Sequence, residues 1–64
     1  MAKTIKRFNN LLHQTEYLYR TRPTRWTNDK SLCLKMAAQE AAQESEWLNF
    51  IGQSHEVIEV EGNH

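Results

Sequence analysis

The chain contains 64 residues, of which eight are Lys or Arg and eight are Asp or Glu, so its formal net charge at pH 7 is zero. A chain this short forms one small domain that buries only about 60% of its unfolded surface, and such domains usually need a disulfide, a metal or a partner. Cys33 is the only cysteine, which excludes an intramolecular disulfide, and the three histidines lack the spacing of zinc ligands. No apolar run of about 18 residues and no signal-peptide pattern occurs, so we expect neither a membrane segment nor a signal peptide.

The charges are segregated along the chain. Residues 1–30 contain seven basic and two acidic residues, a net charge of +5, whereas residues 31–64 contain one basic and six acidic residues, a net charge of −5. One interpretation is that the two halves attract each other, within one chain or between two antiparallel chains. The alternative is a basic N-terminal patch that binds nucleic acid. The residues of that patch are Lys3, Lys6, Arg7, Arg20, Arg22 and Arg25.

The first predicted element is a helix from about Thr4 to Arg20. Apolar residues recur here at steps of three and four, which is the spacing of one face of an amphipathic helix. The stripe consists of Ile5, Phe8, Leu12, Thr15 and Tyr19. Pro23 has no N–H and disfavours helical backbone at Arg22, so this helix must end before it.

A second helix is predicted from Thr27 or Asn28, either of which is a good N-cap, to about Ile51. Its interior is rich in Ala, Gln, Glu, Leu and Met, which favour helix. Gly52 suits the C′ position, where the backbone adopts the left-handed conformation. The remaining residues, 53–64, alternate loosely between polar and apolar, and form either a short edge strand or a disordered acidic tail.

The second predicted helix carries a seam of mostly small residues with heptad spacing, which is typical of a close helix–helix contact. The fold class that follows is all-α: an antiparallel hairpin of two helices in residues 1–52, followed by an acidic tail in residues 53–64. Because a single hairpin leaves the backs of both helices in water, we expect two copies to dimerise into a four-helix bundle. The predicted dimer interface consists of Leu34, Ala38, Ala41, Ser45, Leu48, Ile5, Phe8 and Leu12.

Two groups of residues are candidates for partner binding. Arg20, Arg22, Arg25 and Trp26 combine three guanidinium groups with an indole, a combination that grips phosphates and stacks on bases. The alternative is a solvated turn in which Trp26 caps the hydrophobic core. Trp47, near the end of the second predicted helix, suits an interface hot spot, and the alternative is that it packs against the first helix.

No catalytic constellation is evident in the sequence. There is no Gly-rich phosphate loop, since the only glycines are Gly52 and Gly62, and Glu40 and Glu44 fit a solvated helix face. Cys33 lacks an activating environment in a chain of two helices. We therefore expect no enzymatic activity, no cofactor and no metal site.

Residues 5–12, IKRFNNLL, and residues 46–51, EWLNFI, resemble the small early proteins of lambdoid phages, particularly those of the exo–xis region, between the exonuclease and excisionase genes. The resemblance implies a non-catalytic early factor in the host cytoplasm, connected with host takeover and with the choice between lysis and lysogeny. The expected function is that of a regulatory adaptor, a homodimer that binds an unidentified host or phage protein. The alternative is a small dimeric nucleic-acid-binding protein that uses the basic N-terminal half.

Overall fold

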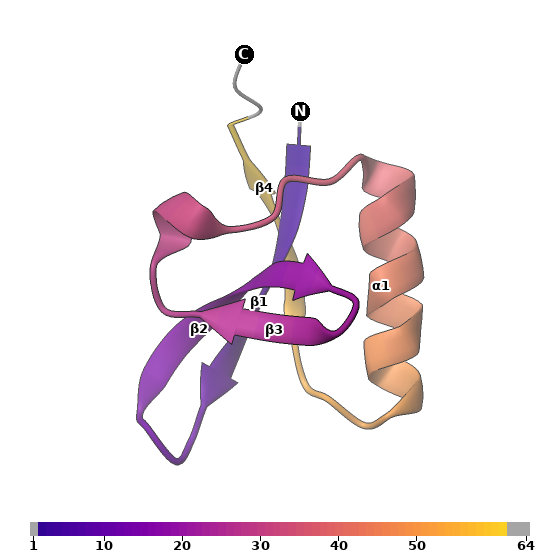
Figure 1. The fold of residues 1–64 in the computed structure, drawn as a ribbon. Coiled ribbons are helices and arrows are strands. Elements are labelled where there is room, and N and C mark those ends of the chain that lie inside the picture. Colours follow the sequence, from indigo (N-terminus) through magenta and orange to yellow (C-terminus); the bar gives the residue numbers. More distant parts are fainter. Residues whose placement is uncertain (1, 62–64) are drawn as a thin grey trace.

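The computed structural model describes residues 2–61, which form a four-stranded sheet and one α-helix. The elements are β1 (Ala2–Asn9), β2 (Gln14–Thr21), β3 (Thr24–Thr27), the 3-10 helix η1 (Lys30–Leu32), α1 (Ala38–Phe50) and β4 (Glu56–Val60). Neighbouring strands are antiparallel, and their order in the sheet is β3-β2-β1-β4. Figure 1 shows the β2–β3 ribbon crossing the direction of β1 and β4, with α1 running alongside the sheet.

The predicted all-α helical hairpin is wrong, because residues 4–20 form an antiparallel β-hairpin. Four of the five residues that make the apolar spacing have Thr, Ile, Phe or Tyr side chains, which favour strands. In β2 the burial alternates with a period of two, since Glu16 and Leu18 are buried whereas Thr15 and Tyr19 are exposed. Without the first helix, two copies of this chain cannot form the predicted four-helix bundle.

The turn of this hairpin is made by Asn9 and His13. Oδ1 of Asn9 accepts hydrogen bonds from the backbone N–H groups of Leu11, at 3.0 Å, and Leu12, at 3.1 Å. Such a bond from an asparagine to the backbone ahead of it stabilises a turn. His13 then takes a left-handed conformation with a φ of 54°, and β2 starts at the next residue. These local bonds interrupt the helix that the apolar spacing predicts.

The second predicted helix exists, but it starts at Ala38 rather than before η1. The preceding segment is held extended by backbone hydrogen bonds to the sheet. Met36 and Lys3 exchange two bonds of 2.8 Å, and the N–H of Leu34 donates to the carbonyl of Leu18 at 2.8 Å. These bonds replace the ones that a longer helix would make within itself, so the helix is confined to the residues that follow.

The C-terminal end of α1 is where the sequence predicts it. Gly52 has a φ of 80°, the left-handed conformation expected of a C′ glycine. Its N–H donates to the carbonyl of Asn49 at 3.1 Å, and the N–H of Gln53 donates to the carbonyl of Leu48 at 2.8 Å. This pair of bonds is a Schellman motif, which satisfies two carbonyl groups that the end of a helix leaves free.

Of the two alternatives for the residues after Gly52, the structure has the edge strand. β4 pairs with β1 over five residues, from Ala2 opposite Val60 to Lys6 opposite Glu56. Residues 62–64 of the predicted tail lie outside the described residues. The sheet therefore joins the first and last parts of the described chain.

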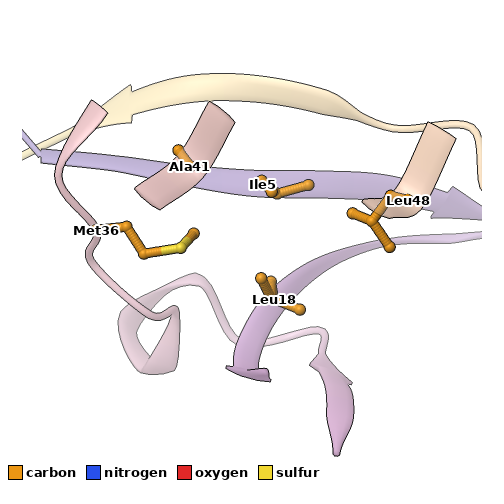
Figure 2. Packing of buried hydrophobic residues seen from close by; sticks show 5 residues of the cluster. All are labelled: Ile5, Leu18, Met36, Ala41 and Leu48. Atoms are coloured by element: carbon orange, nitrogen blue, oxygen red, sulfur yellow. The ribbon is translucent and has the colours of Figure 1, made fainter. Parts of the chain in front are cut away.

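The hydrophobic core lies between α1 and one face of the sheet. Figure 2 shows its five buried side chains, which come from β1, β2, the segment before α1 and α1 itself. They are Ile5, Leu18, Met36, Ala41 and Leu48. Trp26 and Leu34 are partly buried and pack against this cluster. Three of the five buried side chains come from α1 and β1, so the contact between these two elements contributes most of the core.

Thr4 provides a test of the packing in β1. It is fully buried, and its hydroxyl has no hydrogen-bond partner within residues 2–61. We expect Thr4→Val to raise the free energy of unfolding by about 1 kcal/mol, because it removes an unsatisfied polar group and keeps a β-branched side chain. In a domain of this size that is a rise of roughly 4–8 °C in Tm, measurable by thermal unfolding. The control is Thr15→Val at an exposed position, which should change Tm little; a lower Tm for Thr4→Val contradicts the prediction.

Candidate functional site

α1 covers one face of the sheet, and the other face is exposed at Phe8, Tyr19, Arg20 and Arg25, although Thr4 on that face is buried. Ile5 in β1, Leu18 in β2 and Trp26 in β3 belong to the core or pack against it, so they lie on the face that α1 covers. Because successive strand residues point to opposite faces, the residues next to them in sequence lie on the other face. We name this other face the open face. Its residues on the three strands include Lys6, Phe8, Tyr17, Tyr19 and Arg25.

Three aromatic side chains lie close together on the open face. Lys6 pairs with Tyr17 across β1 and β2, and Phe8 pairs with Thr15, so Phe8 and Tyr17 are diagonal neighbours. Tyr19 follows on the same face, two positions further along β2. Phe8 is 54% exposed and Tyr19 is 41% exposed, so both rings are accessible to a planar group from solution.

A β-bulge in β2 brings two guanidinium groups to the same face. The register between β2 and β3 shifts between Leu18 and Arg20, so that Arg20 stands directly opposite Arg25. The next pair, Thr21 and Thr24, lines a hollow beside α1. By alternation, Arg20 and Arg25 therefore lie on the open face.

Arg20 and Arg25 form an unfavourable pair, because like charges directly opposite each other destabilise a sheet. No carboxylate within residues 2–61 lies within 4.0 Å of either guanidinium group, and the same holds for Arg22 in the turn between β2 and β3. Both residues of the pair are exposed. An anion that binds between them would remove the repulsion.

The basic residues of β1, in contrast, are paired with acidic residues of the same chain. Nζ of Lys3 lies 3.0 Å from Glu59 Oε2, and Nζ of Lys6 lies 3.8 Å from Glu56 Oε1, in both cases across the β1–β4 pair. All four side chains are partly or largely exposed, so each pair contributes little to stability. The two pairs nevertheless neutralise the edge of the sheet at β4.

Arg7 lies on the covered face and is held in a network. Its Nε and Nη2 donate to Glu16 Oε1 at 2.9 and 2.8 Å, and its Nη1 donates to Gln53 Oε1 at 3.0 Å. Its guanidinium group also lies over the ring of Trp26, 4.3 Å from the centroid. Arg7 and Trp26 thus stabilise each other at the end of the core and are not available together to a ligand.

Glu16 is the acidic centre of this network and is buried. A hydrogen bond from Gln14 is the largest of the effects that lower the pKa of Glu16 below its ordinary value. Burial opposes that lowering, and hydrogen bonds from Arg7 and Asn9 add to it. Gln14 Nε2 lies 2.9 Å from Glu16 Oε2, and Asn9 Nδ2 lies 3.2 Å from the same oxygen. Glu16 is therefore ionised at neutral pH.

A shallow hollow of about 280 Å³ adjoins the aromatic residues of the open face. It lies where the segment before β4 approaches the ends of β1 and β2. Its lining residues are Lys6, Arg7, Phe8, Thr15, Ser54, His55 and Glu56. The hollow gives a planar group room beside the ring of Phe8.

The structure places the residues of the predicted dimer interface in several locations. Three are buried in the core of the same chain: Ile5, Ala41 and Leu48. Two are partly buried: Leu34, which packs against the core, and Ser45, whose Oγ lies 2.7 Å from His55 Nε2. The other three are exposed: Ala38, Phe8 and Leu12. The heptad seam thus contributes its most buried residues to the contact between α1 and β1.

The partner-binding candidates are also separated. Arg20 and Arg25 lie on the open face, and Arg22 lies in the turn, where its peptide bond to Pro23 is cis. Trp26 lies beneath Arg7 and packs against the core. Trp47 is exposed on α1, and its ring stacks on that of Phe50 with centroids 5.9 Å apart.

Tyr17 is the site residue that the sequence reasoning missed, and Tyr19 was assigned only to an apolar stripe. The signal that identifies both is the alternation of Glu16, Tyr17, Leu18 and Tyr19 in β2, which puts both tyrosines on one side of a strand.

Comparisons of the chain with protein-family models, with curated proteins and with solved structures find no match. Within residues 2–61, no helix is long and apolar enough to cross a membrane. In that same part of the chain, no group of three or more His, Cys, Asp or Glu side chains is arranged to hold a metal ion. The candidate site is therefore defined by the geometry of the open face.

Glu16→Gln tests the network around Arg7. We expect this variant to lower the free energy of unfolding at pH 7 by about 2 kcal/mol, because the partly buried guanidinium group loses its anionic partner. The pKa of Glu16 is lower in the folded chain than its ordinary value of 4.5, so its contribution is present above that pH and is lost as the pH falls through the folded-state pKa. Wild type should thus lose more stability than the variant on acidification below pH 4.5, measured by urea unfolding across that range.

The matched control is Glu46→Gln, at an exposed position of α1, which should leave the free energy of unfolding nearly unchanged at both neutral and acid pH. Equal stability of Glu16→Gln and wild type at pH 7 would mean that the network does not stabilise the fold.

Proposed function

We propose that this protein binds single-stranded nucleic acid on the open face of its sheet and performs no catalysis. The observation that carries the proposal is the cross-strand pair of Arg20 and Arg25, which has no acidic partner within residues 2–61 and lies beside the exposed ring of Tyr19. Repulsion between the two guanidinium groups favours binding of an anion between them. The neighbouring aromatic rings favour an anion that carries bases.

The chemistry of the pair suits a phosphate group. A guanidinium group presents a planar fork of N–H donors that matches two phosphate oxygens, and it stays charged at any physiological pH. A phosphate between Arg20 and Arg25 would be held from two sides and would replace a repulsion with two attractions. Arg22, in the adjacent turn, lines the hollow beside α1 and is not part of this pair.

The aromatic residues suit unpaired bases. Bases of a single strand stack on aromatic side chains with about 1–3 kcal/mol per base, largely without regard to sequence. Tyr19, Tyr17 and Phe8 follow one another from β2 to β1 on the open face. A strand whose phosphate is held at Arg20 and Arg25 can therefore place successive bases along this row.

Double-stranded nucleic acid suits this surface less well. Stacking on the open face requires bases that are not already paired and stacked. Recognition of a duplex commonly uses a helix in the major groove, and α1 carries Glu40, Glu44 and Glu46 but no Lys or Arg. Phosphates would repel such a helix.

The distribution of charge over the fold favours binding of nucleic acid at one part of the open face. The three strands β1, β2 and β3 come from the basic half of the sequence, whereas α1 and β4 come from the acidic half. α1 lies on the other face, and β4 lies at one edge with Glu56 and Glu59, both exposed. We therefore expect the nucleic acid to lie over β2 and β3, away from β4.

This proposal takes up the nucleic-acid alternative raised by the sequence and sets it in the context that the sequence resemblance implies. A small, non-catalytic early protein of a lambdoid phage would act in the cytoplasm of the infected cell, where single-stranded DNA and messenger RNA are both present. The proposal is compatible with a free, buried Cys33, since a reducing cytoplasm does not oxidise thiols to disulfides.

A regulatory adaptor that binds a protein is the second candidate. It is favoured by a hollow of about 620 Å³ between α1 and the β2–β3 turn, lined by Trp47, Pro23 and Arg22 among others. An exposed tryptophan at the wall of a hollow is typical of a protein-binding surface. Trp47→Ala would abolish adaptor activity and leave oligonucleotide binding unchanged, which separates the two candidates.

The arginine pair is tested by the salt dependence of binding to fluorescently labelled oligonucleotides of thymine or uracil, followed by anisotropy. We expect affinity to fall steeply with salt, because bound phosphates release counterions. Arg25→Ala should weaken binding and reduce the slope of log K against log salt by about 0.7, the contribution of one phosphate on a single strand. Lys30→Ala, in η1 and outside the sheet, is the matched control and should leave the slope unchanged.

The aromatic residues are tested in the same assay by Tyr19→Ala. Loss of one stacked base should weaken binding roughly 5- to 150-fold, by about 1–3 kcal/mol, and should leave the salt slope unchanged. Phe50→Ala removes an exposed ring from α1 instead and should have no effect on binding. An absence of binding at low salt, or equal binding by wild type and Tyr19→Ala, would rule out the open face as the site.

A further inference from the structure

Two segments at one end of the molecule contain no charged residues, and the charged side chain that lies beside both of them, Arg7, is paired with Glu16. Residues 8–15, which include the β1–β2 turn, contain no Asp, Glu, Lys or Arg, and neither do residues 47–55, which include the end of α1. Figure 1 shows the β1–β2 turn and the C-terminal end of α1 at the same end of the fold. All sixteen acidic and basic residues of the chain therefore lie outside these two segments.

The uncharged end exposes large apolar side chains. Leu11 is 92% exposed and Leu12 is 63% exposed at the β1–β2 turn, and Phe50 is 82% exposed and Ile51 is 52% exposed at the end of α1. We name these four residues the apolar end. A single exposed leucine is ordinary, but four large apolar residues at one end of a chain of 64 residues mark an interaction surface.

The two halves of the apolar end are held in a fixed relation by the protein itself. Arg7 in β1 donates to Gln53, just after α1, at 3.0 Å, which ties the strand to the end of the helix. Beside the β1–β2 turn lies a hollow of about 330 Å³, whose lining includes Arg7, Phe8, Leu11 and Gln53 but neither Phe50 nor Ile51. A side chain from another molecule can enter this hollow and contact Leu11.

The lack of charge identifies the kind of partner. A charged surface meets like charges when it faces a copy of itself, whereas an uncharged apolar surface does not, and homodimer interfaces are depleted of charge at their centre. A copy of this chain presents a matching surface by necessity. No other stretch of residues 2–61 as long as these two lacks charged residues.

The exposed area of the apolar end is also sufficient for the apolar part of a dimer interface. The four residues of the apolar end expose on the order of 500 Å². A standard interface buries roughly 800 Å² of each partner, and homodimer interfaces are about 65% apolar. The apolar end supplies that apolar share, and the polar neighbours Asn10, His13 and Asn49 surround it as a rim.

We propose that two copies of this protein form a symmetric dimer through the apolar end. The four residues of the apolar end are all different from Arg20, Arg25, Tyr17 and Tyr19, and Phe8 is the stacking residue that also borders the hollow beside the apolar end. In the dimer, the open faces remain uncovered at Arg20, Arg25 and Tyr19. The dimer contact also stabilises a domain of this size, which has a single cysteine and cannot form a disulfide within the chain.

The test is the solution mass, measured by light scattering on a sizing column over a range of concentrations from micromolar to millimolar. We expect twice the chain mass of 7.6 kDa for wild type. Leu11→Asp and Phe50→Asp should each give the mass of a single chain, because each dimer would bury two uncompensated charges. Leu32→Asp is the matched control, since Leu32 is 60% exposed but lies in η1, and it should remain dimeric.

Circular dichroism of each variant checks that the fold is kept, and a second measurement needs no variant. On dilution of wild type, amide resonances of residues 10–13 and 49–53 should shift, and those of η1 should not. A single-chain mass for wild type at all concentrations, a persisting dimer in both Leu11→Asp and Phe50→Asp, or dilution shifts elsewhere would each overturn the proposal. Oligonucleotide binding by a monomeric variant would leave the function of the open face standing.

Discussion

The backbone pairing of Met36 with Lys3 fixes where α1 begins relative to the sheet. Two hydrogen bonds of 2.8 Å attach the chain to β1 directly before the helix, and a third joins Leu34 to Leu18. The helix that follows packs on one face, where Ala41 and Leu48 meet Ile5. On the opposite face, Phe8 in β1 and Tyr19 and Arg20 in β2 are exposed to solvent, whereas Thr4 in β1 is buried.

The network around Glu16 determines which cations remain free. Arg7 is neutralised by Glu16 on the covered face, and Lys3 and Lys6 lie close to acidic residues of β4. The basic residues beyond the bulge in β2 have no such partner within residues 2–61. The net charge of zero therefore conceals a positive region on the open face, because the acidic residues lie in α1, in β4 and just after it, at Asp29 before η1, and at Glu16 on the covered face. The electrostatic attraction of an anion depends on this local arrangement of charges and not on the net charge of the chain.

Part of this structure can be predicted from the sequence. Gly52 correctly predicts the end of α1, because left-handed backbone is a requirement of that one residue. Pro23 correctly predicts a break in the chain, because its effect on the backbone is also local. The strands were missed because steps of three and four between apolar residues also occur by chance in a strand, and because the turn at Asn9 depends on one side-chain hydrogen bond. The late start of α1 could not be predicted, since the bonds of Met36 join residues more than thirty positions apart.

The site, like the fold, could be predicted from the sequence only where it depends on local features of the chain. The cluster of arginines is visible in the sequence, but its place beside Tyr17 and Tyr19 depends on a β-bulge that only the pairing of β2 with β3 reveals.

The most direct test of the account is a titration of the isotope-labelled protein with a short single-stranded oligonucleotide, followed by amide chemical shifts. The account predicts shifts concentrated at residues 6–8, 17–20 and 25, with α1 unperturbed. Shifts confined to α1 and the β2–β3 turn, or no shifts at low salt, would contradict it.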